Sequence, residues 1–260
     1  MRNVARSSPR ASLAEMLYAV LKPLVLLVMR LLFRLEARNR HHVPERGPVL
    51  LVANHASVLD PPLVGSVVRR PVSFLAKAEL FRIPVFGAVL RRLNARPVRR
   101  EGADAGALRE ALRTLRDGRV VLVFPEGTRG EEGTVRPFKT GAGMLAVLSE
   151  AEVVPVVIRG SGRAWPRGRA FPRPAKVTAT FGPPLRFTRR DDEDRKDQYE
   201  RATQAMMQAL TRLMETSGPV PVSAAARPTG QELEAVGGAG TDDARPLQFT
   251  YGRKGQHGQR

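Results

Sequence analysis

His55 and Asp60 stand out among the 260 residues because their types and spacing could carry out a reaction. They frame a short stretch that begins where an apolar run, residues 49–53, stops. A carboxylate one short turn beyond a histidine can bind one ring nitrogen and leave the other facing a substrate. We therefore predict that His55 is a general base and that Asp60 orients it.

Two alternatives for this pair stay open. A single histidine inside a domain is more often structural than catalytic. The position of His55 just after an apolar strand favours chemistry, because α/β proteins collect ligands at the carboxyl ends of strands. Asp60 has a second candidate role as the N-cap of a helix that begins at Pro61.

No protein nucleophile is expected. The sequence contains no cysteine, which also excludes disulfides and thiolate metal ligands. Ser57 lies near the histidine, but no Gly-x-Ser-x-Gly motif surrounds a serine. A base without a nucleophile is expected to activate a hydroxyl group of the substrate itself.

A second candidate site is the hexapeptide Phe124–Arg129, which also follows an apolar run. Gly127 permits close approach of the backbone to a ligand, Thr128 adds a hydroxyl, and the planar guanidinium of Arg129 suits phosphate. Glu126 would repel phosphate, so we expect it to pair with an arginine or to accept a substrate hydroxyl. Lys139 precedes a predicted helix and is a weaker candidate anion ligand. The alternative is an ordinary turn with solvated charges.

The elements that would position these residues alternate between strands and helices. This order predicts an α/β fold with a mostly parallel central sheet flanked by helices. Pro155, inside an expected strand, predicts an edge strand or a bulge. Strands are expected at 49–53, 72–76, 119–124, 153–158 and 176–181, and helices at 61–70, 79–93, 104–117, 141–151 and 193–215.

Residues 13–35 are apolar but interrupted by charged residues and by Pro23. The longest uncharged run, Pro23 to Met29, is too short to span a bilayer, which needs about 20 apolar residues. We predict an amphipathic, membrane-associating helical segment with Lys22, Arg30 and Arg34 at the level of the lipid headgroups. The alternative is an amphipathic helix packed on the domain.

The predicted division of the chain is a basic N-terminus with the membrane-associating segment (1–38), one globular domain (39–216) and a disordered tail (217–260). The formal net charge of +18 favours polyanionic partners, although a general preference for arginine explains part of it. The basic residues are scattered and aromatics are only 5%, so nucleic acid is not an expected partner.

The motifs together resemble those of the glycerophospholipid acyltransferases, in particular the 1-acylglycerol-3-phosphate acyltransferases. Asn54-His55 to Asp60 resembles the first family block, Phe124–Arg129 the third, and the Val-Pro strand 154–158 the fourth. Residues 94–100 depart from the second block because they lack its Gly and its aromatic residue. Arg100 is the preferred match to the closing arginine of that block, with Arg99 as the alternative.

The resemblance implies transfer of a fatty acyl group from an acyl thioester, carried by coenzyme A or acyl carrier protein, to the free hydroxyl of 1-acylglycerol-3-phosphate. The product is phosphatidic acid. His55 would be the base and Asp60 its orienting partner. Glu126, Gly127, Thr128 and Arg129 would handle the glycerol phosphate, helped by Arg100. The resemblance implies neither a metal nor a cofactor, and it places the protein on a membrane, expected at its cytoplasmic face.

Two other functions stay open. One is acylation of a lysolipid with a different headgroup, and the other is lipid binding without catalysis. The intact His55 and Asp60 favour an enzyme.

Overall fold

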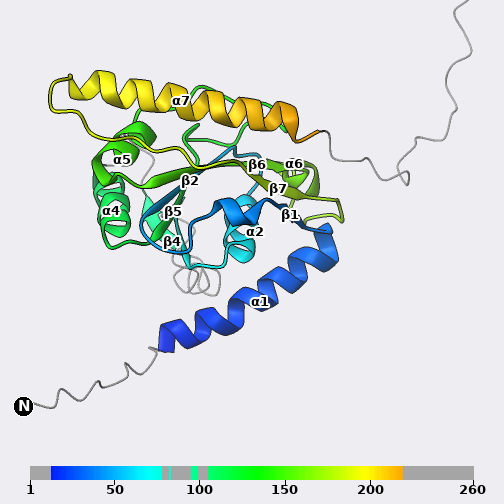
Figure 1. Ribbon diagram of the computed structural model, residues 1–260. Helices are drawn as coiled ribbons and strands as arrows, with labels where there is room; N and C mark the ends of the chain where they lie inside the picture. Colours follow the sequence, from blue (N-terminus) through cyan, green and yellow to red (C-terminus); the bar gives the residue numbers. More distant parts are fainter. Residues whose placement is uncertain (1–12, 78–81, 83–94, 99–104, 219–260) are drawn as a thin grey trace, which may run out of the picture. The chain divides into compact units, whose positions relative to one another are not determined.

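Strongly apolar runs form the centre of a seven-stranded sheet in the computed structural model, which describes residues 13–77, 82, 95–98 and 105–218 (Figure 1). The strand order is β1-β7-β6-β2-β5-β3-β4. Only β6 and β7 pair antiparallel in this described sheet, so the predicted mostly parallel sheet is confirmed. The strands are β1 (Glu36–Arg38), β2 (Val49–Ala53), β3 (Val72–Lys77), β4 (Ala95–Val98), β5 (Val120–Val123), β6 (Glu152–Arg159) and β7 (Thr178–Phe181).

Helices cover both faces of the sheet, as a parallel sheet requires (Figure 1). Leu51 of β2 packs in a core with α1 and α2, whereas its neighbour Leu50 packs in a second core with α4, α5 and α7. The described helices are α1 (Leu13–Phe33), the 3-10 turn η1 (Arg40–His42), α2 (Asp60–Val67), α4 (Ala105–Arg116), α5 (Gly141–Ser149), α6 (Ser161–Ala164) and α7 (Arg195–Thr216).

Pro155 does not lie on an edge strand, because β6 lies inside the sheet between β7 and β2, but the pairing on the β7 side supports the alternative of a bulge. Pro155 is paired in register with Val52 of β2. Its carbonyl accepts the N–H of Gly182 on the β7 side, where the β6–β7 ladder only begins at Val156. Val153 pairs with Leu185 beyond this ladder, so the partner segment has one residue more than β6 between the two pairings. The missing N–H of Pro155 faces this irregularity and not a regular ladder position.

The first strand was not predicted, since its residues were assigned to the end of the N-terminal segment. Glu36–Arg38 pairs in parallel with β7 and is half-buried along its length. A strand of three residues with two charged side chains carries almost no hydrophobic pattern. It is recognisable only once β7 is in place beside it.

The predicted N-terminal helix is present as α1, and one side of it packs on the domain. Met29 and Phe33 are buried in the core shared with α2. The ammonium of Lys22 donates to the carbonyls of Val68 and Arg69 at the end of α2, and burial lowers the pKa of Lys22. The position of Lys22 at the headgroup level was therefore a wrong expectation, because the side chain is turned inward.

The other side of α1 is apolar and exposed. Val20, Leu24, Leu27 and Leu31 follow helical spacing, and their exposed fractions range from 53% to 72%. Within the residues that the structure describes, no helix is both long and apolar enough to cross a membrane.

Some expected elements lie outside the described residues. These are the 79–93 helix apart from Arg82, the Asp104 cap, and the tail beyond Gly218. At the end of α7 the chain does turn as expected, with Gly218 at a φ of 65°.

Candidate active site

The candidate site begins at the carboxyl end of β2, where a buried asparagine locks the strand to its neighbour. The Asn54 amide donates to the carbonyl of Ile158 at 2.9 Å and accepts the N–H of the same residue at 2.7 Å. A side chain thus continues the β2–β6 pairing one step beyond Ala53, the last paired residue. The following loop therefore leaves the sheet from a rigid point.

His55 and Asp60 are in direct contact, as expected from their spacing. The Nδ1 atom of His55 lies 2.8 Å from Oδ2 of Asp60. Because an ionised carboxylate only accepts hydrogen bonds, Nδ1 carries the proton in this pairing. The Nε2 atom is then the basic nitrogen. The Asp60 side chain is fully buried and that of His55 is 13% exposed.

Asp60 also shapes the loop that carries the histidine. Its Oδ2 accepts the backbone N–H groups of Ala56 and Ser57, each at 2.8 Å. The predicted N-cap role of Asp60 is wrong, since Leu59 occupies that position and Asp60 is the first residue of α2. The carboxylate points back to the N–H groups of the loop instead of forward to those of the helix.

The remaining contacts of this loop fix the imidazole ring and occupy the nearby serine. The His55 ring stacks on Phe124 with centroids 4.1 Å apart and planes inclined by 22°. The Ser57 hydroxyl donates to the carbonyl of Trp165 and accepts the N–H of Leu59. The serine is therefore engaged in structure, consistent with the expectation that it is not a nucleophile.

The second predicted loop lies against the first. The N–H of Gly130 donates to the carbonyl of His55 at 2.7 Å. Gly127 has a φ of 71°, and a Cβ placed there would lie only 2.7 Å from Cε of Lys139. The structure thus brings Lys139 over the Gly127 turn, as its candidate role as an anion ligand requires.

Glu126 lies inside this pair of loops, and its carboxyl group is enclosed. Its Oε1 accepts the backbone N–H of His55 at 3.3 Å, and its Oε2 is buried without a hydrogen-bond partner among the described residues. Burial raises the pKa of Glu126 to about 7, against the smaller lowering effects of the His55 N–H and of Arg136. The nearby charge of Asp60 raises it further. In this arrangement Glu126 holds the backbone of the histidine.

Two further residues were missed by sequence reasoning. The carboxylate of Glu132 accepts the N–H groups of Gly160 and Gly162, and so ties the second loop to the segment after β6. Arg167 from that segment contacts Thr128 and Arg129. No motif or spacing marks these pairs, because they are about 30 to 40 residues apart and meet only through the path of the loops.

Arg100 and its alternative Arg99 lie outside the described residues. Thr128 and Arg129 are partly exposed on the second loop. Among the described residues, no group of three His, Asp or Glu side chains is arranged to hold a metal ion.

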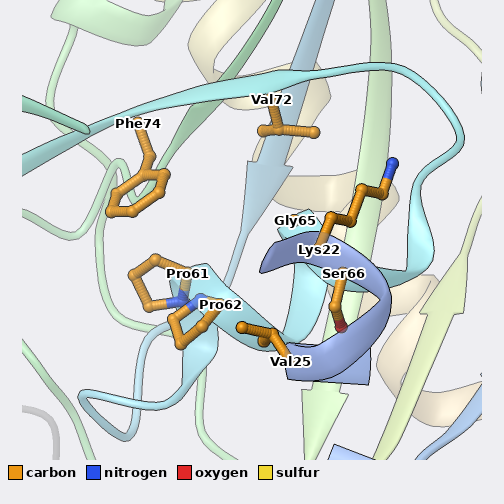
Figure 2. Close-up of a pocket in the computed structure, with 8 residues that line it drawn as sticks. All are labelled: Lys22, Val25, Pro61, Pro62, Gly65, Ser66, Val72 and Phe74. Carbon is orange, nitrogen blue, oxygen red and sulfur yellow. The ribbon is translucent and has the colours of Figure 1, made fainter. Parts of the chain in front are cut away.

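A small cavity lies on the α1–α2 side of the site (Figure 2). Its volume is about 20 Å³, which is room for a single water and not for a fatty acyl chain. The cavity is lined by Lys22, Val25, Pro61, Pro62, Gly65, Ser66, Val72 and Phe74. Pro61 directly follows Asp60 in the sequence, but neither His55 nor Asp60 lines this cavity.

A buried His–Asp pair and a glycine-containing loop at neighbouring strand ends agree with what the family comparison finds. Residues 34–159 match the Acyltransferase family model. The resemblance to the 1-acylglycerol-3-phosphate acyltransferases is thereby confirmed, because curated relatives carry that name and a solved structure of one has the same fold.

Three relatives illustrate the similarity. The 1-acyl-sn-glycerol-3-phosphate acyltransferase of Bacillus subtilis is 26% identical over 176 residues, which are 67% of this chain and 85% of that protein. The enzyme of the same name from Limnanthes alba is 29% identical over 154 residues, or 58% and 54% of the two chains. The crystal structure of the 1-acyl-sn-glycerophosphate acyltransferase PlsC from Thermotoga maritima superposes with a TM-score of 0.66 at 28% sequence identity. The superposition covers 78% of this chain and 80% of that chain.

The matches to the curated plant relatives cover about half of those proteins, between 40% and 54%. Shared sequence and fold therefore apply to the acyltransferase domain.

Proposed function

We propose that the protein transfers a fatty acyl group from an acyl thioester to the free hydroxyl of 1-acylglycerol-3-phosphate, giving phosphatidic acid. The observation that carries this proposal is the His55–Asp60 hydrogen bond of 2.8 Å beside the Gly127–Arg129 loop. This hydrogen bond and the loop lie at the carboxyl ends of the neighbouring strands β2 and β5, which supports a proposed role of His55 as base and of the loop as phosphate ligand. The names of the relatives support the choice of acceptor.

The mechanism needs only a base and two positioned substrates. The acceptor hydroxyl gives its proton to Nε2 of His55 as its oxygen attacks the thioester carbonyl carbon. The imidazolium that forms is stabilised by the Asp60 carboxylate. The tetrahedral intermediate then expels the thiolate as the carbon–sulfur bond breaks, and the thiolate takes the proton from His55. The products are the diacyl phosphate and the free thiol.

The donor is an acyl thioester of coenzyme A or of acyl carrier protein. No resident cofactor or metal takes part in these steps. Because a thiolate is a good leaving group, the contribution required of the protein is orientation and proton transfer.

We further propose that the protein works at a lipid surface, where its acceptor and product reside. The support is the exposed apolar side of α1, in which Val20, Leu24, Leu27 and Leu31 lie on one helical face. An amphipathic helix of this kind lies in the headgroup region with its apolar side buried. Since the opposite side of α1 packs on the domain, the helix would hold the domain against the membrane.

We expect His55→Ala to reduce acyl transfer to 1-acylglycerol-3-phosphate by about 10²- to 10⁴-fold, because the general base is lost. The assay supplies a panel of lysolipids with acyl-coenzyme A or acyl-acyl carrier protein and identifies products by lipid mass spectrometry. Thermal unfolding should change little, since the imidazole side chain makes one hydrogen bond, to Asp60, and one ring contact, with Phe124, among the described residues. Full turnover by a folded His55→Ala protein would contradict the mechanism. If the wild type acylated only a different lysolipid in the panel, the choice of 1-acylglycerol-3-phosphate as acceptor would be contradicted.

A further inference from the structure

The segment between β6 and β7, residues 160–177, is held against both loops of the candidate site. Glu132 accepts two of its backbone N–H groups, and Ser57 donates to the carbonyl of Trp165 at 3.1 Å. The indole N–H of Trp165 in turn donates to the carbonyl of Arg169 at 2.8 Å. The backbone on both sides of Arg167 is thus fixed relative to the catalytic pair.

Arg167 reaches from this segment to the second loop. Its Nη2 donates to the carbonyl of Arg129 at 2.8 Å and to the hydroxyl of Thr128 at 3.3 Å. Both contacts use one nitrogen, whereas a guanidinium offers five N–H donors. Among the described residues, Nη1 and Nε have no hydrogen-bond partner and no carboxylate forms an ion pair with Arg167. The second loop therefore holds the guanidinium of Arg167 in place, but no carboxylate of the described residues neutralises its charge.

The surroundings of this guanidinium are cationic. Lys139 lies over Gly127, and the side chain of Arg136 lies against Gly130. Glu131 is exposed in the same region, whereas the other two carboxyl groups of this loop offer little compensation. That of Glu126 is enclosed and its pKa is raised to about 7, and that of Glu132 is bound to two backbone N–H groups. The exposed cations of this turn are suited to bind a dianionic phosphate ester.

We propose that Arg167 is a specificity-determining residue that binds the phosphate of the acyl acceptor above the Thr128–Arg129 turn. This role rests on the proposed function. Nη2 stays on the loop, and Nη1 and Nε donate to the phosphate oxygens. The sequence motifs assign phosphate binding to the second loop, helped by Arg100, whereas the fold adds Arg167 from a different segment.

The competing explanation is that Arg167 only supports the loop by hydrogen bonding to its backbone. The two roles respond differently to substitution. Arg167→Gln keeps an N–H donor for the Arg129 carbonyl but removes the charge, and Arg167→Lys keeps the charge but loses the fork geometry. Arg169→Gln is a matched control, because it makes the same change in the same segment at an exposed side chain that has no hydrogen bond to the second loop.

The test measures steady-state kinetics of the full chain in mixed micelles, varying 1-acylglycerol-3-phosphate and acyl-coenzyme A in separate arms. We expect Arg167→Gln to raise the acceptor KM about tenfold with kcat within about twofold, which is the effect of losing one charged hydrogen-bonding group. The acceptor KM of Arg167→Lys should lie between those of the wild type and Arg167→Gln. Arg169→Gln should match the wild type in both arms.

Three results would overturn the proposal. An unchanged acceptor KM in Arg167→Gln leaves no phosphate role. A rise in KM for acyl-coenzyme A, with no change in KM for the acceptor, would assign Arg167 to the phosphates of the donor. A fall in kcat with a lowered melting temperature, equal for the Gln and Lys variants, shows a supporting role only. Failure of the wild type to acylate 1-acylglycerol-3-phosphate would instead reject the proposed function itself.

Discussion

A single oxygen atom, Oδ2 of Asp60, receives three hydrogen bonds: from the imidazole of His55 and from the N–H groups of Ala56 and Ser57. The orientation of the base and the conformation of its loop therefore depend on the same carboxylate. Substitution of Asp60 changes both at once, so activity loss in such a variant is informative only beside a measurement of stability. His55 carries less of this structural role, which makes it the cleaner residue to substitute.

Glu126 should give the protein a pH-dependent stability. The pKa of its carboxyl group is raised by burial from 4.5 to about 7 in the folded protein. Between these values the folded state keeps a proton that the unfolded chain releases, so stability falls as pH rises through this window. We expect the free energy of unfolding of the wild type, relative to Glu126→Gln, to fall by at most about 3 kcal/mol between pH 4.5 and 7.5.

Urea unfolding of the wild type and Glu126→Gln at a series of pH values measures this difference. Glu131→Gln serves as the control, because that carboxyl group is exposed in the same region. A constant difference between the wild type and Glu126→Gln across the window would mean that Glu126 does not retain its proton in the folded state.

At the scale of elements, β2 and β6 are joined beyond their backbone ladder by the amide of Asn54. Both of its hydrogen bonds go to Ile158, and Asn54 is only 1% exposed. A buried backbone N–H and carbonyl that lose their partners cost about 1–3 kcal/mol each. The two hydrogen bonds of Asn54 therefore stabilise the sheet at the point where the loop that carries His55 leaves it.

We expect Asn54→Ala to lower the free energy of unfolding by about 2–4 kcal/mol, because both polar groups of Ile158 are left unpaired in the core. Denaturant unfolding at pH 7 measures the effect. Ser66→Ala is the comparison, since it removes a buried hydrogen bond confined to α2, to the carbonyl of Leu63. A loss in Asn54→Ala no larger than that in Ser66→Ala would show that Asn54 does not join the strands energetically.

The elements that could be predicted from the sequence are those with a strong local pattern. β2, β5 and β6 are continuous apolar runs, and α7 repeats its apolar residues at helical spacing, so each was expected close to its observed bounds. The His55–Asp60 contact was also predictable, because only four residues separate the pair. Glu132, Arg167 and the β1–β7 pairing depend on where distant segments meet. No local pattern carries that information.

At the scale of the whole molecule, a strongly basic chain carries an apolar helix face. The formal net charge is +18, and the exposed large apolar residues of α1 are leucine and valine. Electrostatic attraction to anionic lipid is screened by salt, whereas burial of apolar side chains is not. Deletion of residues up to Arg34 would be a poor test of membrane binding, since it also removes the buried Phe33 from the core.

We expect the triple substitution Leu24→Gln, Leu27→Gln and Leu31→Gln to weaken binding to neutral vesicles at high salt by at least about tenfold, because each buried leucine contributes more than 1 kcal/mol. Binding to anionic vesicles at low salt should persist in part. Vesicle sedimentation measures both. Phe171→Gln, which removes an 81% exposed apolar side chain elsewhere, should bind like the wild type. Unchanged binding of the triple variant would exclude α1 as the membrane-contacting helix.

The hydrogen bonds of Asn54 to Ile158 and of Ser57 to Trp165 also bear on how the protein folds during translation. Asn54 precedes Ile158 by 104 residues, and Ser57 precedes Trp165 by 108. The ribosome therefore delivers the histidine and its carboxylate long before the segments that hold their loop in place. A nascent chain that ends before β6 contains both chemical groups without the support of their loop. The loop that carries His55 and Asp60 thus gains its support late in translation, when the second half of the domain emerges and packs against it.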